Sequence, residues 1–250
     1  MDSGLYAAYT GLLGRTQALD TAANNLANAG TVGFRAQRDY FSGVLAGIDD
    51  STSASQVGDA INNYGVLGGS LIDEAQGTIT ATGNPLDLAL NGQGFFAVQT
   101  AQGIQYTRDG GFTRSSSGQL QTQHGEPVLD TSGQPITVPS GTIDIAPDGS
   151  ISVTTPDGSA IAGKIGIFNF PPDADLTALG TNRFAAPAGV QPRSSDATIQ
   201  QGALEGANLD TVHGTMQLIL IQRQAEMMQK ALSVFNNDFD KTAAEDLGRV

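Results

Sequence analysis

The sequence predicts an α+β protein in which long N- and C-terminal helices pair as a coiled-coil-like domain beside a central, mostly antiparallel β domain. Three observations predict this fold: a seven-residue leucine repeat near the N-terminus, a second apolar stripe of helical period near the C-terminus, and short alternating segments between them. The predicted divisions are an N-terminal helix in 1–40, a connector in 41–77, a β domain in 78–204 and a C-terminal helix in 205–250.

The first element is a helix predicted over residues 3–28, beginning after an N-cap at Ser3 and ending before Gly30. Burying its four leucines returns roughly 6–12 kcal/mol, whereas ordering each backbone residue costs about 1–2 kcal/mol. We therefore expect this helix to need a partner. Its candidate contact residues are the heptad leucines and the asparagines at its end: Leu5, Leu12, Leu19, Asn24, Asn25, Leu26 and Asn28.

The last element is a helix predicted from residue 208 to about 246, with its own apolar stripe. The candidate contact residues on it are Leu209, Val212, Met216, Ile219, Leu220, Met227 and Val234. For the heptad leucines of the first helix, periodicity alone leaves two interpretations open at about even odds, because an apolar face fits the core of the helix's own domain as well as a contact between subunits.

The middle of the chain favours β structure. Residues 41–77 show no clear period and are interpreted as a connector with one or two strands. Further strands are predicted near 78–81, 86–90, 95–100, 105–107, 143–145, 151–153 and 164–170. The turn pairs Asn91-Gly92, Asp109-Gly110 and Asp148-Gly149 lie between them. Strands at this spacing predict an antiparallel β domain.

Composition excludes several classes of function. The net charge is −13, of which −10 falls within residues 41–200, so nucleic acid and anionic membrane are poor partners. The chain has no cysteine, no apolar run long enough to span a bilayer, and no N-terminal pattern of a cleavable signal peptide. If the protein leaves the cytoplasm, it uses a route that needs no such signal.

No segment predicts an enzyme. Gly92-Gln93-Gly94 lacks the third glycine and the following helix of a dinucleotide site, and a strand-joining turn is the better interpretation. His124 and His213 lack the clustered ligands of a zinc site. We therefore predict no catalytic residues, no metal, no cofactor and no small-molecule substrate.

Four ordered blocks resemble signatures of the bacterial flagellar rod and hook protein family. They are NNLANAGTVGF at 24–34, ATGNPLDLALNGQGFF at 81–96, YTRDGGF at 106–112 and GALEGAN at 202–208. Together they span nearly the whole chain. Ser115 departs from the acidic residue that the family often has there, which puts only the turn at Gly118 in doubt. The length, the MDSGLY start and the DLGRV end are more like the proximal-rod type than the distal-rod type or the longer hook protein.

This resemblance implies a structural axial component of the flagellar basal body, located in the rod that spans the periplasm. It implies polymerisation through the terminal helices, torque transmission between motor and hook, and partnership with other rod and hook proteins and with copies of itself. It also implies export by the flagellar type III apparatus. The alternatives are a distal-rod or hook-type member of the same family, or a non-flagellar surface protein whose helices form an oligomerisation stalk.

Overall fold

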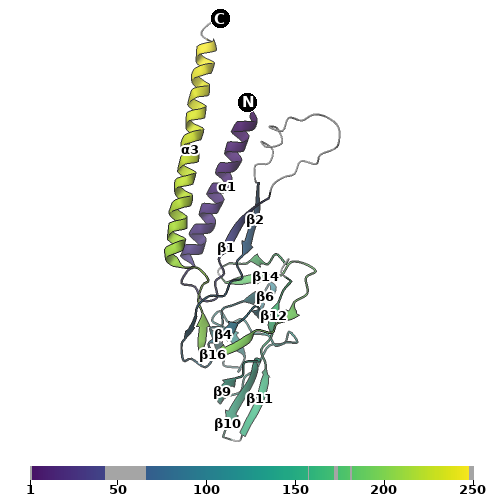
Figure 1. Ribbon diagram of the computed structural model, residues 1–250. Helices are drawn as coiled ribbons and strands as arrows, with labels where there is room; N and C mark the ends of the chain where they lie inside the picture. The colour runs from purple at the N-terminus through teal and green to yellow at the C-terminus, as the bar shows by residue number, and fades with distance from the viewer. Residues whose placement is uncertain (1, 43–65, 157, 172–173, 181, 248–250) are drawn as a thin grey trace. The chain divides into compact units, whose positions relative to one another are not determined.

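The computed structural model describes residues 2–42, 66–156, 158–171, 174–180 and 182–247, and Figure 1 shows their course. They form two compact units, each assembled from separate stretches of sequence. The helical unit takes the described parts of 1–26, 37–71 and 211–250. The β-rich unit, called the body below, takes 27–36 and the described parts of 72–210.

The helical unit contains the two helices of the described chain and a two-stranded sheet. The elements are α1 (Asp2–Ala27), β1 (Gln37–Ser42), β2 (Val66–Ile72) and α3 (Thr211–Leu247). Asn25 near the end of α1 fixes the start of β1, because its side-chain amide donates to the Gln37 carbonyl at 2.8 Å and its oxygen accepts from the Gln37 N–H at 2.9 Å. Neither helix is long and apolar enough over its described residues to cross a membrane.

The predicted pairing of the terminal helices as a coiled-coil-like domain is wrong. The described residues contain two helices and a large antiparallel β-rich body, and the two predicted apolar stripes do not meet in a shared seam. The most buried positions of α3 are Gly214, Ala225 and Leu232, whereas Val212 and Met227 are exposed. Since each residue turns a helix by about 100°, these two sets lie on opposite sides of α3.

A close approach between the two helices involves a small residue that the leucine repeat does not include. A Cβ atom added to Gly11 of α1 would lie 3.5 Å from the terminal methyl carbon of Met228 on α3. Gly14 of α1 is buried as well, while Leu12 and Leu19 are half-buried. The leucine period therefore marks residues that share a face of α1, but the structure does not place that face against the predicted stripe of α3.

The body is built from short antiparallel strands. Its largest sheet has the strand order β13-β14-β6-β5-β12-β15, and β11-β10-β9 form a three-stranded sheet; β16-β4, β17-β3 and β7-β8 are separate pairs. The strands are β3 (Ile79–Ala81), β4 (Leu88–Asn91), β5 (Phe95–Thr100), β6 (Gly103–Thr107), β7 (Phe112–Arg114), β8 (Leu120–Thr122), β9 (Thr142–Ile145), β10 (Ser150–Thr155), β11 (Gly158–Lys164), β12 (Ile167–Asn169), β13 (Thr177–Ala178), β14 (Arg183–Ala185), β15 (Arg193–Ser194), β16 (Thr198–Gln201) and β17 (Ala203–Glu205).

Strand β5 separates two apolar cores within the body. Successive side chains of a strand point to opposite faces, so Phe96 and Val98 enter one core while Phe95 and Ala97 enter the other. The first core contains the edge-on pair of Phe96 and Phe112, with ring centroids 5.1 Å apart. The strand predicted over 95–100 is confirmed by β5, and both of its faces are buried.

Candidate functional site

Three of the sequence blocks converge on one buried carboxylate in the body. Glu205 of β17 is fully buried, and Arg35 and Arg108 are buried beside it. Arg35 Nη2 lies 2.9 Å from Glu205 Oε1, and Arg108 Nη1 donates to Glu205 Oε2 at 3.1 Å. We call these three residues the charge cluster. It joins positions separated by up to 170 residues of sequence.

The charge cluster holds two cations against one anion. Burial, followed by the charge of Arg35, lowers the pKa of Arg108 to about 10, and Glu205 opposes this shift. Arg108 therefore stays protonated at neutral pH. Its remaining partners are the Gly92 carbonyl, which accepts from Nη2 at 2.7 Å, and the Phe95 ring, whose centroid lies 5.5 Å from Cζ. The cluster thus joins distant parts of the body through buried, charged hydrogen bonds.

Gly33 lets the 27–36 segment of the body lie close to the backbone of Asp109. Gly33 has a φ of +68°, and a Cβ atom there would lie 2.3 Å from the Asp109 backbone nitrogen. The Gly33 N–H donates to the Glu205 carbonyl at 2.8 Å. Nearby, Asn182 Nδ2 donates to both the Val32 carbonyl at 3.3 Å and Asp109 Oδ2 at 3.0 Å. Burial raises the pKa of the Asp109 carboxyl, and the hydrogen bonds that it accepts from the Gly111 N–H and from Asn182 oppose that rise.

Six of the predicted contact residues of the C-terminal helix are exposed apolar side chains on one side of α3. We call this set the α3 stripe, and its members have between 47% and 64% of their surface exposed: Val212, Met216, Ile219, Leu220, Met227 and Val234. Leu209, which precedes α3, is half-buried in the body. An exposed patch of large apolar side chains is a mark of a binding surface.

The predicted contact residues of α1 have mixed environments. Leu5 lies outside the residues whose side chains the structure describes, and Leu12, Leu19 and Leu26 are half-buried. Asn24 is exposed, whereas Asn25 is buried against β1 as described above. Asn28 organises the turn after the helix, because its carbonyl accepts from the Thr31 N–H at 2.9 Å.

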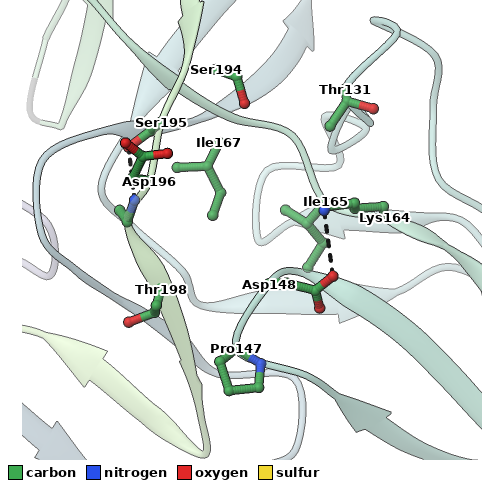
Figure 2. Close-up of a pocket in the computed structure, with 11 residues that line it drawn as sticks. Thr131, Pro147, Asp148, Lys164, Ile165, Ile167, Ser194, Ser195, Asp196 and Thr198 are labelled. Atoms are coloured by element: carbon green, nitrogen blue, oxygen red, sulfur yellow. Dashed lines mark hydrogen bonds and ion pairs between the residues drawn. The ribbon is translucent and has the colours of Figure 1, made fainter.

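The body also contains an open pocket of about 420 Å³, shown in Figure 2. Its largest apolar side chains are those of Ile165 and Ile167, and Lys164 and Asp148 form an exposed ion pair of 3.4 Å beside them. Ser195 Oγ donates to the Gln93 carbonyl and accepts from the Ala197 N–H, so this hydroxyl is not aligned with a base. Across the described residues, no three His, Asp or Glu side chains gather at metal-binding distance.

Sequence reasoning missed the charge cluster, although each of its members lies in or beside a recognised block. Arg35 directly follows the first block, Arg108 lies inside the third and Glu205 inside the fourth. The available signal was a charged residue within a glycine-rich, apolar motif. Pattern alone could not show that these three charges meet.

Comparison with known families supports the interpretation of the four blocks. Residues 5–35 match the family model described as flagella basal body rod protein, and residues 89–153 match the flagellar hook protein FlgE/F/G D1 domain. The flagellar basal-body rod protein FlgF of Caulobacter vibrioides is 35% identical over the whole of both chains. FlgF of Mesorhizobium japonicum is 33% identical over 90% of each chain, and FlgG of Agrobacterium fabrum is 32% identical over 90% of this chain and 92% of its own.

A β-rich body locked by a buried charge cluster, together with a helix that exposes an apolar face, defines a structural assembly protein. The chain belongs to the flagellar basal-body rod protein family. It is a structural component of the rod, and its location is the flagellar basal body. The resemblance predicted from the sequence blocks is thereby confirmed.

Proposed function

We propose that this protein polymerises within the rod by burying the apolar faces of its terminal helices against neighbouring subunits, and that the resulting assembly transmits torque between motor and hook. The α3 stripe carries this proposal, because it exposes six large apolar side chains on the side of α3 opposite its buried positions. The neighbours are copies of this chain and other axial rod and hook proteins.

The free energy gained by covering the α3 stripe is too small to hold a rod together without further contacts. Covering six half-exposed apolar side chains returns on the order of 5–10 kcal/mol. Bringing two proteins together costs about 4–15 kcal/mol in lost freedom and ordering. One stripe therefore roughly balances one association, and a stable rod requires the leucine face of α1 or further subunits to contribute as well.

We propose that this protein occupies the FlgF-type position within the rod. Relatives named FlgF match 33–35% of positions over at least 90% of their length, and FlgG relatives match up to 32%. Export through the flagellar type III apparatus is part of the same proposal. It is supported by the weakness of the N-terminal helix as an isolated element, which suits a segment that folds on assembly. The protein performs this role without catalysis, metal or cofactor.

The test uses cells of a flagellated host that lacks its own FlgF-type gene and expresses this chain. Met216→Asp and Met227→Asp are expected to abolish rods and swimming, because each places a carboxylate in the surface to be buried. Gln229→Asp is the matched control, since it adds the same charge at an exposed position of α3 away from the stripe. Electron microscopy counts basal bodies, and normal swimming by both methionine variants would contradict the proposal.

A further inference from the structure

The chain passes between the helical unit and the body at four points. These are the links 26–27, 36–37, 71–72 and 210–211. On the body side, they lead into three short segments, 27–36, 72–77 and 203–210. Each link is a single peptide chain with soft backbone torsions, so without further bonds these segments could move separately under load.

Asn208 ties the three segments together through its side chain. Its oxygen accepts from the Ala36 N–H at 2.7 Å, and its amide donates to the Asp73 carbonyl at 2.7 Å and to the Ala75 carbonyl at 3.0 Å. The Asp73 N–H in turn donates to the Ala36 carbonyl at 2.8 Å. One side chain thus bonds to the backbone of both segments that lead into β1 and out of β2.

The charge cluster joins the same three segments a few residues away. Glu205 Oε1 accepts from the Gly77 N–H at 2.8 Å and pairs with Arg35, while Arg35 Nη1 donates to the Ala75 carbonyl. Both members of this ion pair are buried, so solvent screening weakens it little. Arg35, Glu205 and Asn208 together are called the crossing clamp.

We propose that the crossing clamp is the joint through which torque passes between the terminal helices and the body. This inference rests on the proposed function, since torque reaches the chain only in an assembled rod. Arg35, Glu205 and Asn208 are positioning residues in this role. They bond the segments 27–36, 72–77 and 203–210 to one another. Load on any one link is therefore shared by all three segments.

Asn208→Ala is the test variant and Gln201→Ala is its matched control. Gln201 also makes three side-chain bonds to backbone groups, but its partners are Ile145, Pro85 and Ile143. Asn208→Ala removes three hydrogen bonds of about 1 kcal/mol each, and 1.4 kcal/mol is tenfold, so the joint should open about a hundredfold more often in this variant. Hydrogen exchange of the purified full chain should accelerate by that factor in peptides covering 33–36 and 73–77, and in Gln201→Ala only near 145.

The functional readout is swimming in the complemented host, in dilute medium and in medium of raised viscosity. Asn208→Ala cells should build flagella in normal number but lose more speed at high load than Gln201→Ala cells do. If Asn208→Ala builds no flagella, Arg35→Lys is measured in its place, since it keeps the cation but loses the two-pronged guanidinium contact. Equal loss of speed with load in clamp and control variants, or unchanged exchange at 33–36 and 73–77, overturns the inference.

Failure of the clamp and failure of the proposed function give different results. If Met227→Asp assembles normal rods, the proposed role of the α3 stripe fails whatever the exchange data show. If Met227→Asp blocks assembly while Asn208→Ala swims normally under load, the stripe is retained and the clamp inference falls.

Discussion

The body and α3 differ in which side chains they bury. The body buries three charged residues in its charge cluster, while α3 leaves the six apolar residues of its stripe exposed. A buried charge persists only where its partners are in place, and the body supplies them within the same chain. An exposed apolar face lacks its partner in the isolated chain. The body therefore supplies the partners of its own buried charges, whereas the α3 stripe gains its partner only in the assembly proposed above.

Replacing Glu205 with alanine tests whether the body depends on internal pairing, and the largest loss of stability is expected here. The change leaves Arg35 and Arg108 buried without their shared anion, which costs about 3–5 kcal/mol. Urea unfolding of the purified chain measures it. Asp148→Ala, which breaks an exposed ion pair with Lys164 and the turn's hydrogen bonds to Ser150, serves as the control and should lower the urea midpoint far less. Equal midpoints for the two variants would show that the cluster does not stabilise the body.

Replacing Gly33 with alanine tests whether stability depends on the close approach of Gly33 to the Asp109 backbone. The left-handed φ costs about 1–2 kcal/mol for alanine, and overpacking against the Asp109 backbone adds about 1–3 kcal/mol. Gly83→Ala is the matched control, because Gly83 has a φ of +77° but nothing within 4 Å of the added Cβ. The difference between the two unfolding free energies isolates the close approach. If Gly33→Ala lowers the free energy of unfolding no more than Gly83→Ala does, the close approach at Gly33 contributes nothing to stability.

A smaller, pH-dependent loss of stability is expected when Glu126 is replaced. Its carboxylate pairs with Arg183 in the body. Burial raises the pKa of Glu126, but the hydrogen bonds from Arg183 and Thr122 outweigh it, so the net pKa is lowered. A lowered carboxyl pKa contributes stability above the ordinary glutamate value, and that contribution is lost as pH falls through the folded-state pKa. Glu126→Gln should cost about 1 kcal/mol or less at pH 7. The difference from wild type should shrink in unfolding curves below pH 4; a constant difference would contradict this assignment.

The smallest effect on stability is expected at the α3 stripe, where it sharpens the contrast with the body. Ile219→Ser changes an exposed side chain and should alter the free energy of unfolding of the isolated chain by about 0.5 kcal/mol or less. The matched change Ile151→Ser, at a fully buried position of β10, should cost several times more. Calorimetric melting compares them. A large loss for Ile219→Ser would mean that the stripe is covered within the chain itself.

The comparison also shows where pattern-based prediction failed. The predicted helical pairing assumed that the most apolar stripe of each terminal helix faces the other. In the structure, Gly11 of α1 lies near Met228 of α3, and glycine brings backbones close without adding apolar signal. An apolar period identifies residues that share a face but not what covers that face.

The sequence by itself determined some of the strands, the tight turns between them and the family of this protein, whereas strands such as β1, β7 and β14 were not predicted. Strand β5 and the turn pair Asp148-Gly149 follow from alternation and from residues that favour tight turns, both of which are local properties. Only the tertiary structure decided that Arg35, Arg108 and Glu205 meet, and that the α3 stripe is the exposed side of its helix. The physical reason is distance along the chain: local forces set each segment, but contacts between positions 35 and 205 exist only once the segments between them have folded.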